Sequence, residues 1–160
     1  MNIVNRMKKY FLFFLSALLV LITACNESKK KEPGTKAPKS EADQLMDQVM
    51  EFHDAAMAKY GKMQGFKQQL KAAMDSIAKL PAKARSAAAP YEAKLETASK
   101  EVNNSINSMD QWMESFNMDS ALNDAQKRVQ YLSNEKLKVS NIKETILKSL
   151  SKADSALKKL

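Results

Sequence analysis

The sequence predicts an all-α fold: an up-down-up three-helix bundle of long amphipathic helices with coiled-coil-like packing, preceded by a signal peptide and a flexible tether. Apolar residues recur every three or four positions through most of residues 41–160, which is the period of a helix that buries one face. No run alternates with period two for long enough to form a strand. The chain has 160 residues with only three Gly and four Pro, so we expect one modest domain.

Residues 1–24 have the pattern of a signal peptide. The basic residues Arg6, Lys8 and Lys9 precede an apolar run at residues 10–22, which is thirteen residues long. A membrane-spanning helix needs about 20 residues. The run therefore indicates the core of a signal peptide rather than a permanent membrane anchor.

Cys25, the only cysteine, lies at the end of a bacterial lipobox. The pattern is an aliphatic residue three positions before the cysteine, here Ile22, followed by two small residues, Thr23 and Ala24. We expect Cys25 to carry a diacylglycerol and an N-acyl group, because more than one acyl chain gives stable anchoring to a membrane. An ordinary secretory signal that happens to contain a cysteine is the alternative.

The residue after the cysteine bears on the destination of the protein. Position 26 is Asn rather than Asp, and by the rule known for enteric lipoproteins this favours the outer membrane. No acidic run that would resemble a surface-export signal follows Cys25. We therefore expect a lipid-anchored protein of the cell envelope, on the periplasmic face of the outer membrane.

Residues 25–40 are expected to be the lipidated cysteine and a flexible tether. They contain two of the four Pro, one of the three Gly and no apolar periodicity. A flexible segment of this length spans roughly 20 Å on average, so the body can stand away from the bilayer. We interpret these residues as a solvated spacer, and contact of the three successive lysines at positions 29–31 with anionic head groups is the alternative.

The first helix is expected at residues 41–80. Ser40 followed by Asp43 is typical of a helix N-terminus, and Pro81 ends the pattern. Gly61 and Gly65 lie one turn apart inside this helix, where they either kink it or let a neighbouring helix come close. The apolar stripe of the helix consists of Leu45, Val49, Phe52, Ala56, Met63, Phe66, Leu70, Ala73 and Ile77.

An alanine-rich connector at residues 81–90, bounded by two prolines, leads to a second helix at residues 91–116 and a third at residues 120–158. The connector could hold a short helical turn of its own. The second stripe consists of Tyr91, Leu95, Ala98, Val102, Ile106, Met109, Met113 and Phe116. The third consists of Leu122, Ala125, Val129, Leu132, Val139, Ile146, Leu150, Ala153, Leu157 and Leu160, with Lys136 and Lys143 at two positions of the same stripe. No helix can bury its stripe alone, which predicts the bundle.

Methionines, the only His and the only Trp gather at one end of the predicted bundle. Helices joined by short connections run antiparallel, so the end of the second helix returns to the start of the first. Thioether and imidazole groups select Cu(I) or Ag(I), but methionine is also a flexible filler of helical cores. We interpret the cluster as core packing without a metal, and the alternative is a soft-metal site. That site would use Met46, Met50, His53 and Met113 beside Trp112.

The charges do not indicate a nucleic-acid partner. Of the formal net charge of +8, residues 1–24 and 26–40 carry +3 each, which leaves +2 for the body. Residues 41–58 hold five acids and no base, whereas residues 59–80 hold five lysines and one Asp. Complementarity to the helix dipoles explains such sorting. The alternative is a basic far end that docks on an anionic polymer or an acidic envelope protein.

Three segments resemble a family. They are MDQVMEFHDAAMAKYGKMQGFKQQL at residues 46–70, MDQWMESF at 109–116 and VQYLSNEKLKV at 129–139. Together they are similar to short helical lipoproteins of Bacteroidetes, which often carry the label "viral A-type inclusion protein" or "transmembrane protein". The resemblance implies an all-helical lipoprotein and brings no established activity or catalytic residues.

The sequence contains no pattern typical of an enzyme. A Ser-His-acid triad would need His53, and the adjacent Asp54 points about 100° away on a helix. One Cys and one His also exclude the usual zinc sites. We therefore expect a non-catalytic, lipid-anchored helical lipoprotein, acting as an interaction or spacer protein with no cofactor beyond its acyl chains. The alternative function is a periplasmic protein that binds a soft metal or a small ligand.

Overall fold

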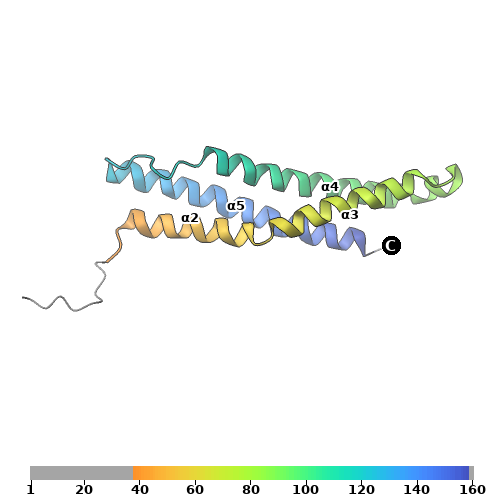
Figure 1. The fold of residues 1–160 in the computed structure, drawn as a ribbon, viewed down its shortest axis with the longest axis horizontal. Helices are drawn as coiled ribbons and strands as arrows, with labels where there is room; N and C mark the ends of the chain where they lie inside the picture. Colours follow the sequence, from red (N-terminus) through yellow and green to blue (C-terminus); the bar gives the residue numbers. More distant parts are fainter. Residues whose placement is uncertain (1–37, 159–160) are drawn as a thin grey trace, which may run out of the picture. The chain divides into compact units, whose positions relative to one another are not determined.

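The computed structural model describes residues 38–158, and every structural statement below refers to them. The predicted signal peptide, Cys25 and Leu160 lie outside this range. Within it the regular structure is entirely helical, which confirms the all-α prediction. The helices are α2 (Glu41–Met57), α3 (Tyr60–Ala78), α4 (Ala82–Ser115) and α5 (Ala125–Leu157), shown in Figure 1. Among these residues, no helix is long and apolar enough to span a membrane.

The helix predicted at residues 41–80 is interrupted after Met57, so that α2 and α3 form one bent segment (Figure 1). At the interruption the Lys59 N–H donates to the Ala56 carbonyl, a tighter turn than that of an α-helix. A Cβ atom added at Gly61 or Gly65 would meet nothing within 4 Å. Neither glycine therefore serves a close approach of another helix, and the bend falls just before Gly61.

The connector predicted at residues 81–90 is instead mostly helical. Pro81 is the N-cap of α4, which begins at Ala82 and continues through Pro90. Alanine has the highest helix propensity of all residues, which favours this extension. Pro90 cannot donate to the carbonyl of Ser86, but Ser86 is exposed and water can bond to that carbonyl.

The third helix begins later than the predicted residue 120. Asp124 caps α5, because its carboxylate accepts a hydrogen bond from the Lys127 N–H at 3.1 Å. Residues 117–124 form a loop of successive turns, in which Ala121 has a positive φ of 57°. Leu122, predicted in the apolar stripe, lies in this loop and is 60% exposed. A local side-chain cap at Asp124 therefore decides where the helix starts.

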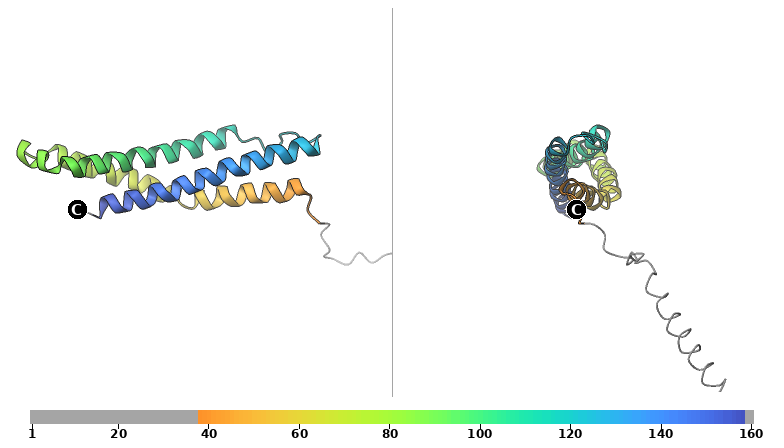
Figure 2. Two further views of the ribbon diagram at one scale, coloured as in Figure 1. Left: turned by 180° about the vertical axis from the view of Figure 1, so that it is seen from behind. Right: turned by 90° about the vertical axis from the view of Figure 1, so that its left-hand side faces the viewer.

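The four helices pack as an up-down-up bundle once α2 and α3 are taken as one bent segment. α2 packs chiefly on α5 and α3 on α4, while α4 and α5 lie together. α2 and α5 run in the same direction and α4 returns between the two ends (Figures 1 and 2). The core contains most of the predicted stripe residues, among them Val49, Met63, Leu70, Leu95, Val102, Met109, Leu132, Val139 and Ile146, all fully buried.

The α3–α4 turn projects past the C-terminal end of α5 (Figures 1 and 2). Every residue from 78 to 87 is exposed. We call residues 79–87 the basic tip, because they contain Lys79, Lys83 and Arg85 and because no acidic residue lies between Asp75 and Glu92. The tip is at the opposite end of the bundle from the start of α2.

Candidate functional site

His53 and Trp112 meet between α2 and α4, as the antiparallel return of the second helix predicts. Their ring centroids lie 5.7 Å apart with an interplanar angle of 37°. Trp112 is buried and His53 is partly exposed at the edge of the bundle. The Nδ1 atom of His53 lies 2.9 Å from a carboxylate oxygen of Asp54, so the expectation that the helix keeps these two adjacent side chains apart is wrong. Nε2 is therefore the ring nitrogen that does not contact Asp54.

An aromatic row continues from this pair toward α5. Trp112 stacks on Phe116 with centroids 4.8 Å apart, and Phe116 stacks on Tyr131 at 6.2 Å. The hydroxyl of Tyr131 accepts a hydrogen bond of 2.8 Å from the Asn117 N–H. The row joins the end of α4 to the first turns of α5 and holds the start of the loop between them.

Glu135 is a buried carboxylate that sequence reasoning missed. It is 5% exposed, and its two oxygens accept hydrogen bonds from Trp112 Nε1 at 2.9 Å and from Lys138 Nζ at 2.7 Å. The hydrogen bond and the negative charge of Glu135 raise the pKa of Lys138. A signal was present, because Glu135 lies three residues after Leu132 and four before Val139, both core positions. Each oxygen has a donor, so the carboxylate is a satisfied structural group.

The methionines of the predicted cluster are not equivalent in the structure. Met109 is fully buried, Met46 and Met50 are partly exposed on α2, and Met113 is 37% exposed. Of the proposed ligand set, His53 and Trp112 are in ring contact. Among residues 38–158, no three His, Cys, Asp or Glu side chains converge as metal ligands.

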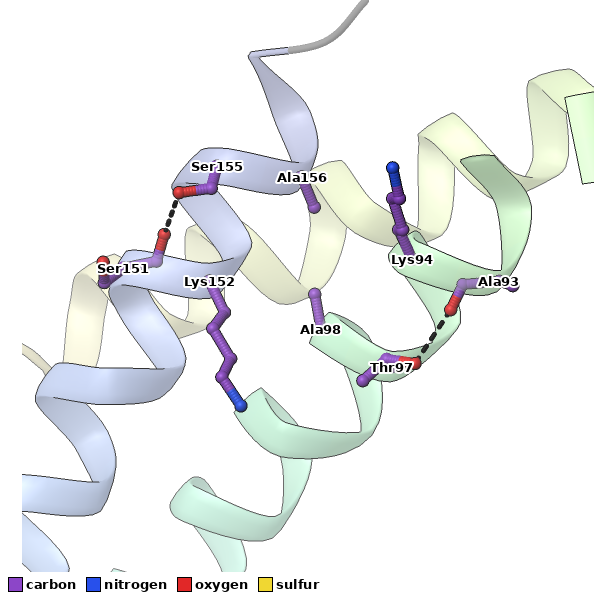
Figure 3. A pocket seen from close by; sticks show the side chains of 8 residues that line it. All are labelled: Ala93, Lys94, Thr97, Ala98, Ser151, Lys152, Ser155 and Ala156. Atoms are coloured by element: carbon purple, nitrogen blue, oxygen red, sulfur yellow. Dashed lines mark hydrogen bonds between the residues drawn. The ribbon is translucent and has the colours of Figure 1, made fainter. Parts of the chain in front are cut away.

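A groove of about 460 Å³ lies between α4 and α5 near the end of α5 (Figure 3). Ala98 and Ala156 face each other across its floor. The Thr97 and Ser155 hydroxyls donate to carbonyls of their own helices, and Lys152 is paired with Glu101 at 2.6 Å. These three polar groups are already bonded within the protein, and Lys94 and Ser151 supply the remaining polar groups of the groove.

Comparisons of the chain with protein-family models, with curated proteins and with solved structures give no match.

Proposed function

We propose that the protein is a non-catalytic, lipid-anchored lipoprotein of the cell envelope that presents the basic tip to an anionic envelope polymer or an acidic envelope protein. The observation that carries the proposal is the position of the tip. Three exposed basic side chains, within a stretch from residue 76 to 91 that contains no acidic residue, lie at the end of the bundle farthest from the start of α2. The chain leads from that start toward Cys25, the proposed acylation site.

The dimensions of the parts support this role. α4 has 34 residues, which corresponds to about 50 Å of helix, and the tether that the sequence predicts at residues 25–40 would add roughly 20 Å of reach. The acidic α2 lies at the anchored end and the basic tip at the other. A long-range field of this sign steers anionic partners toward the tip.

Acylation is tested at Cys25. Cys25→Ser should abolish incorporation of labelled palmitate and release the protein from the membrane fraction. Fractionation of the native protein should place it in the outer membrane, in a position protected from external protease. Labelling that persists in the Cys25→Ser variant would refute the lipid anchor.

The tip is tested by crosslinking in intact cells followed by purification of the full chain. Lys79, Lys83 and Arg85 are changed together to Gln. A matched control removes three exposed lysines of the bundle body, Lys67, Lys100 and Lys148. We expect the crosslinked partner to be lost with the tip variant and kept with the control. Equal capture by both variants would contradict the role of the tip.

The second candidate function is binding of Cu(I) or Ag(I) at the His53 end, and the contact between His53 and Trp112 is the observation that favours it. Trp112 is the only tryptophan, so its fluorescence reports metal binding directly. Under the main proposal we expect no tight binding. Changing Met46, Met50 and Met113 to Leu should then leave folding intact, since such volume-conserving changes usually cost less than about 1.5 kcal/mol. Tight binding that is lost in this variant and in His53→Ala would establish the metal site instead.

A further inference from the structure

We propose that the loop at residues 117–124 docks its apolar side chains on the bilayer that carries the acyl anchor. This inference rests on the proposed lipid anchor. It adds a second, non-covalent contact with the membrane. We call residues 117–124 the apolar loop.

The apolar loop exposes two large hydrophobic side chains. Met118 is 57% exposed and Leu122 is 60% exposed, and Met113 on the last turns of α4 is 37% exposed. Transfer of such side chains from water to the interface of a bilayer is favourable. Half of the six strongly exposed large hydrophobic residues in the described part of the chain therefore lie in or beside one loop.

The position of the loop favours the membrane as its binding partner. The loop and the start of α2 lie at the same end of the bundle (Figures 1 and 2). Only residues 26–38 separate Cys25 from Lys39, and a flexible segment of that length spans roughly 20 Å. The loop is thus confined near the bilayer at a high effective concentration, so that a contact too weak to bind a free protein can still form.

The loop presents these side chains in a defined conformation. The Arg128 guanidinium donates to the Ser120 carbonyl at 2.7 Å, and the Asp119 N–H donates to the side-chain oxygen of Asn117 at 2.9 Å. Ala121 adopts the left-handed backbone region, which turns the chain between Met118 and Leu122. Because the loop is already ordered, docking costs little additional conformational entropy.

The charges of the loop distinguish this contact from an electrostatic one. Its ionisable residues are Asp119 and Asp124, and Asp124 is paired with Lys127. A surface of this kind gains nothing from anionic lipids. Docking should therefore require neither anionic lipids nor low salt, unlike binding by the lysines at positions 29–31.

The experiment uses the full acylated chain in phosphatidylcholine vesicles. Cys25 is occupied by lipid, so Leu122→Cys introduces a single site for an environment-sensitive fluorophore. The control is Leu137→Cys on α5, because Leu137 is 63% exposed and lies outside the loop. We expect a blue shift and quenching by brominated acyl chains at position 122 and neither effect at position 137. A fluorophore at Ser120→Cys should be quenched in the same way. This quenching should be lost when Met118 and Leu122 are both changed to Ser.

Each outcome separates the two proposals. A chain that fails to float with vesicles refutes the anchor, whereas a chain that floats while position 122 behaves like position 137 refutes docking alone. Quenching that requires phosphatidylglycerol, or that disappears at high salt, overturns the apolar contact. A blue shift without vesicles that grows with protein concentration shows that a second copy covers the loop, and this also overturns the proposal.

Discussion

At the scale of single residues, Trp112 of α4 contacts both α2 and α5, which are far apart in the sequence. Its ring lies against His53 of α2 and stacks on Phe116, and its indole nitrogen donates to Glu135 of α5. Trp112 and Glu135 thus form a buried polar contact between α4 and α5. Such a contact stabilises one relative position of the two helices, because any other leaves one oxygen of the buried carboxylate without its donor.

The hydrogen bond of Trp112 is testable by substitution. Trp112→Phe keeps an aromatic ring but leaves Glu135 without one donor, so we expect the free energy of unfolding to fall by about 2–3 kcal/mol. Glu135→Gln keeps an oxygen acceptor for the indole and should cost less. The measurement is urea denaturation followed by circular dichroism, since the Phe variant has no tryptophan. A loss in Trp112→Phe no larger than in Glu135→Gln would contradict this role.

At the scale of elements, side-chain caps set the start of two helices, α2 and α5. Ser40 and Asp43 form a capping box at α2, and Asp124 caps α5. α3 has no side-chain cap and instead follows directly from the turn at residues 58–59. The predicted first helix therefore breaks into one capped and one uncapped helix, and the stripe continues across the break.

The caps predict a dependence of stability on pH. Hydrogen bonds from Ser40 lower the pKa of Asp43, and the Lys127 N–H and ammonium lower the pKa of Asp124. The native state therefore binds fewer protons than the unfolded state just below the ordinary pKa of 3.8. Stability from these groups is present above that pH and is lost as the pH falls through the lowered values.

Acid titration of the unfolding free energy measures this effect. Asp43→Asn together with Asp124→Asn should flatten the decline at acidic pH, because neither amide titrates. Ser40→Ala removes the hydroxyl hydrogen bond to Asp43 but keeps the one from the backbone N–H of residue 40, so it should remove the larger part of the share that Asp43 has in the decline. An unchanged pH profile in the double variant would disprove the assignment.

Gly65 lies inside α3 without a packing reason. Since an added Cβ meets nothing within 4 Å, Gly65→Ala should stabilise the protein by about 0.5–1 kcal/mol. Gly61→Ala, in the first turn of α3, should give a smaller gain. The comparison uses thermal and urea denaturation, and destabilisation by Gly65→Ala would mean that a neighbouring group approaches the glycine.

At the scale of the whole molecule, each of the three segments buries its stripe against the other two. Residues 38–158 are enough for a core of this kind, and we predict that they fold as a monomer. Substitutions in the middle of α4 should reduce stability most, because α4 contacts both α3 and α5.

Val102, which is fully buried in α4, tests this arrangement. Val102→Asp buries an unpaired charge and should cost about 3–5 kcal/mol. Asn104→Asp adds the same charge at an exposed position and should change stability by less than about 0.5 kcal/mol. Circular dichroism gives helicity and sedimentation gives the mass. Helix that persists in Val102→Asp only in an oligomer would favour an open coiled coil over the monomeric bundle.

The expectations that rest on neighbouring residues agree best with the structure. The cap at Ser40, the all-α class and the buried positions Val49, Val102 and Val139 follow from local hydrogen bonding and from helical periodicity. The acylation of Cys25 also rests on a local pattern, and it stays a prediction because that residue lies outside the described range.

Helical periodicity alone specifies that the body is helical and which face of each helix is buried, because both depend on residues within a few turns of one another. The alanine-rich residues 82–90 of α4 and the Asp124 cap, which leaves Leu122 in a loop, are also local features, although the predicted boundaries missed them. The burial of Glu135, in contrast, depends on the packing of α5 against α4. For Glu135 the deciding donor is Trp112, 23 residues away on another helix. Lys138 of the same helix bonds one oxygen of Glu135, but the other oxygen needs a donor from a partner helix, and no pattern within one helix specifies that partner.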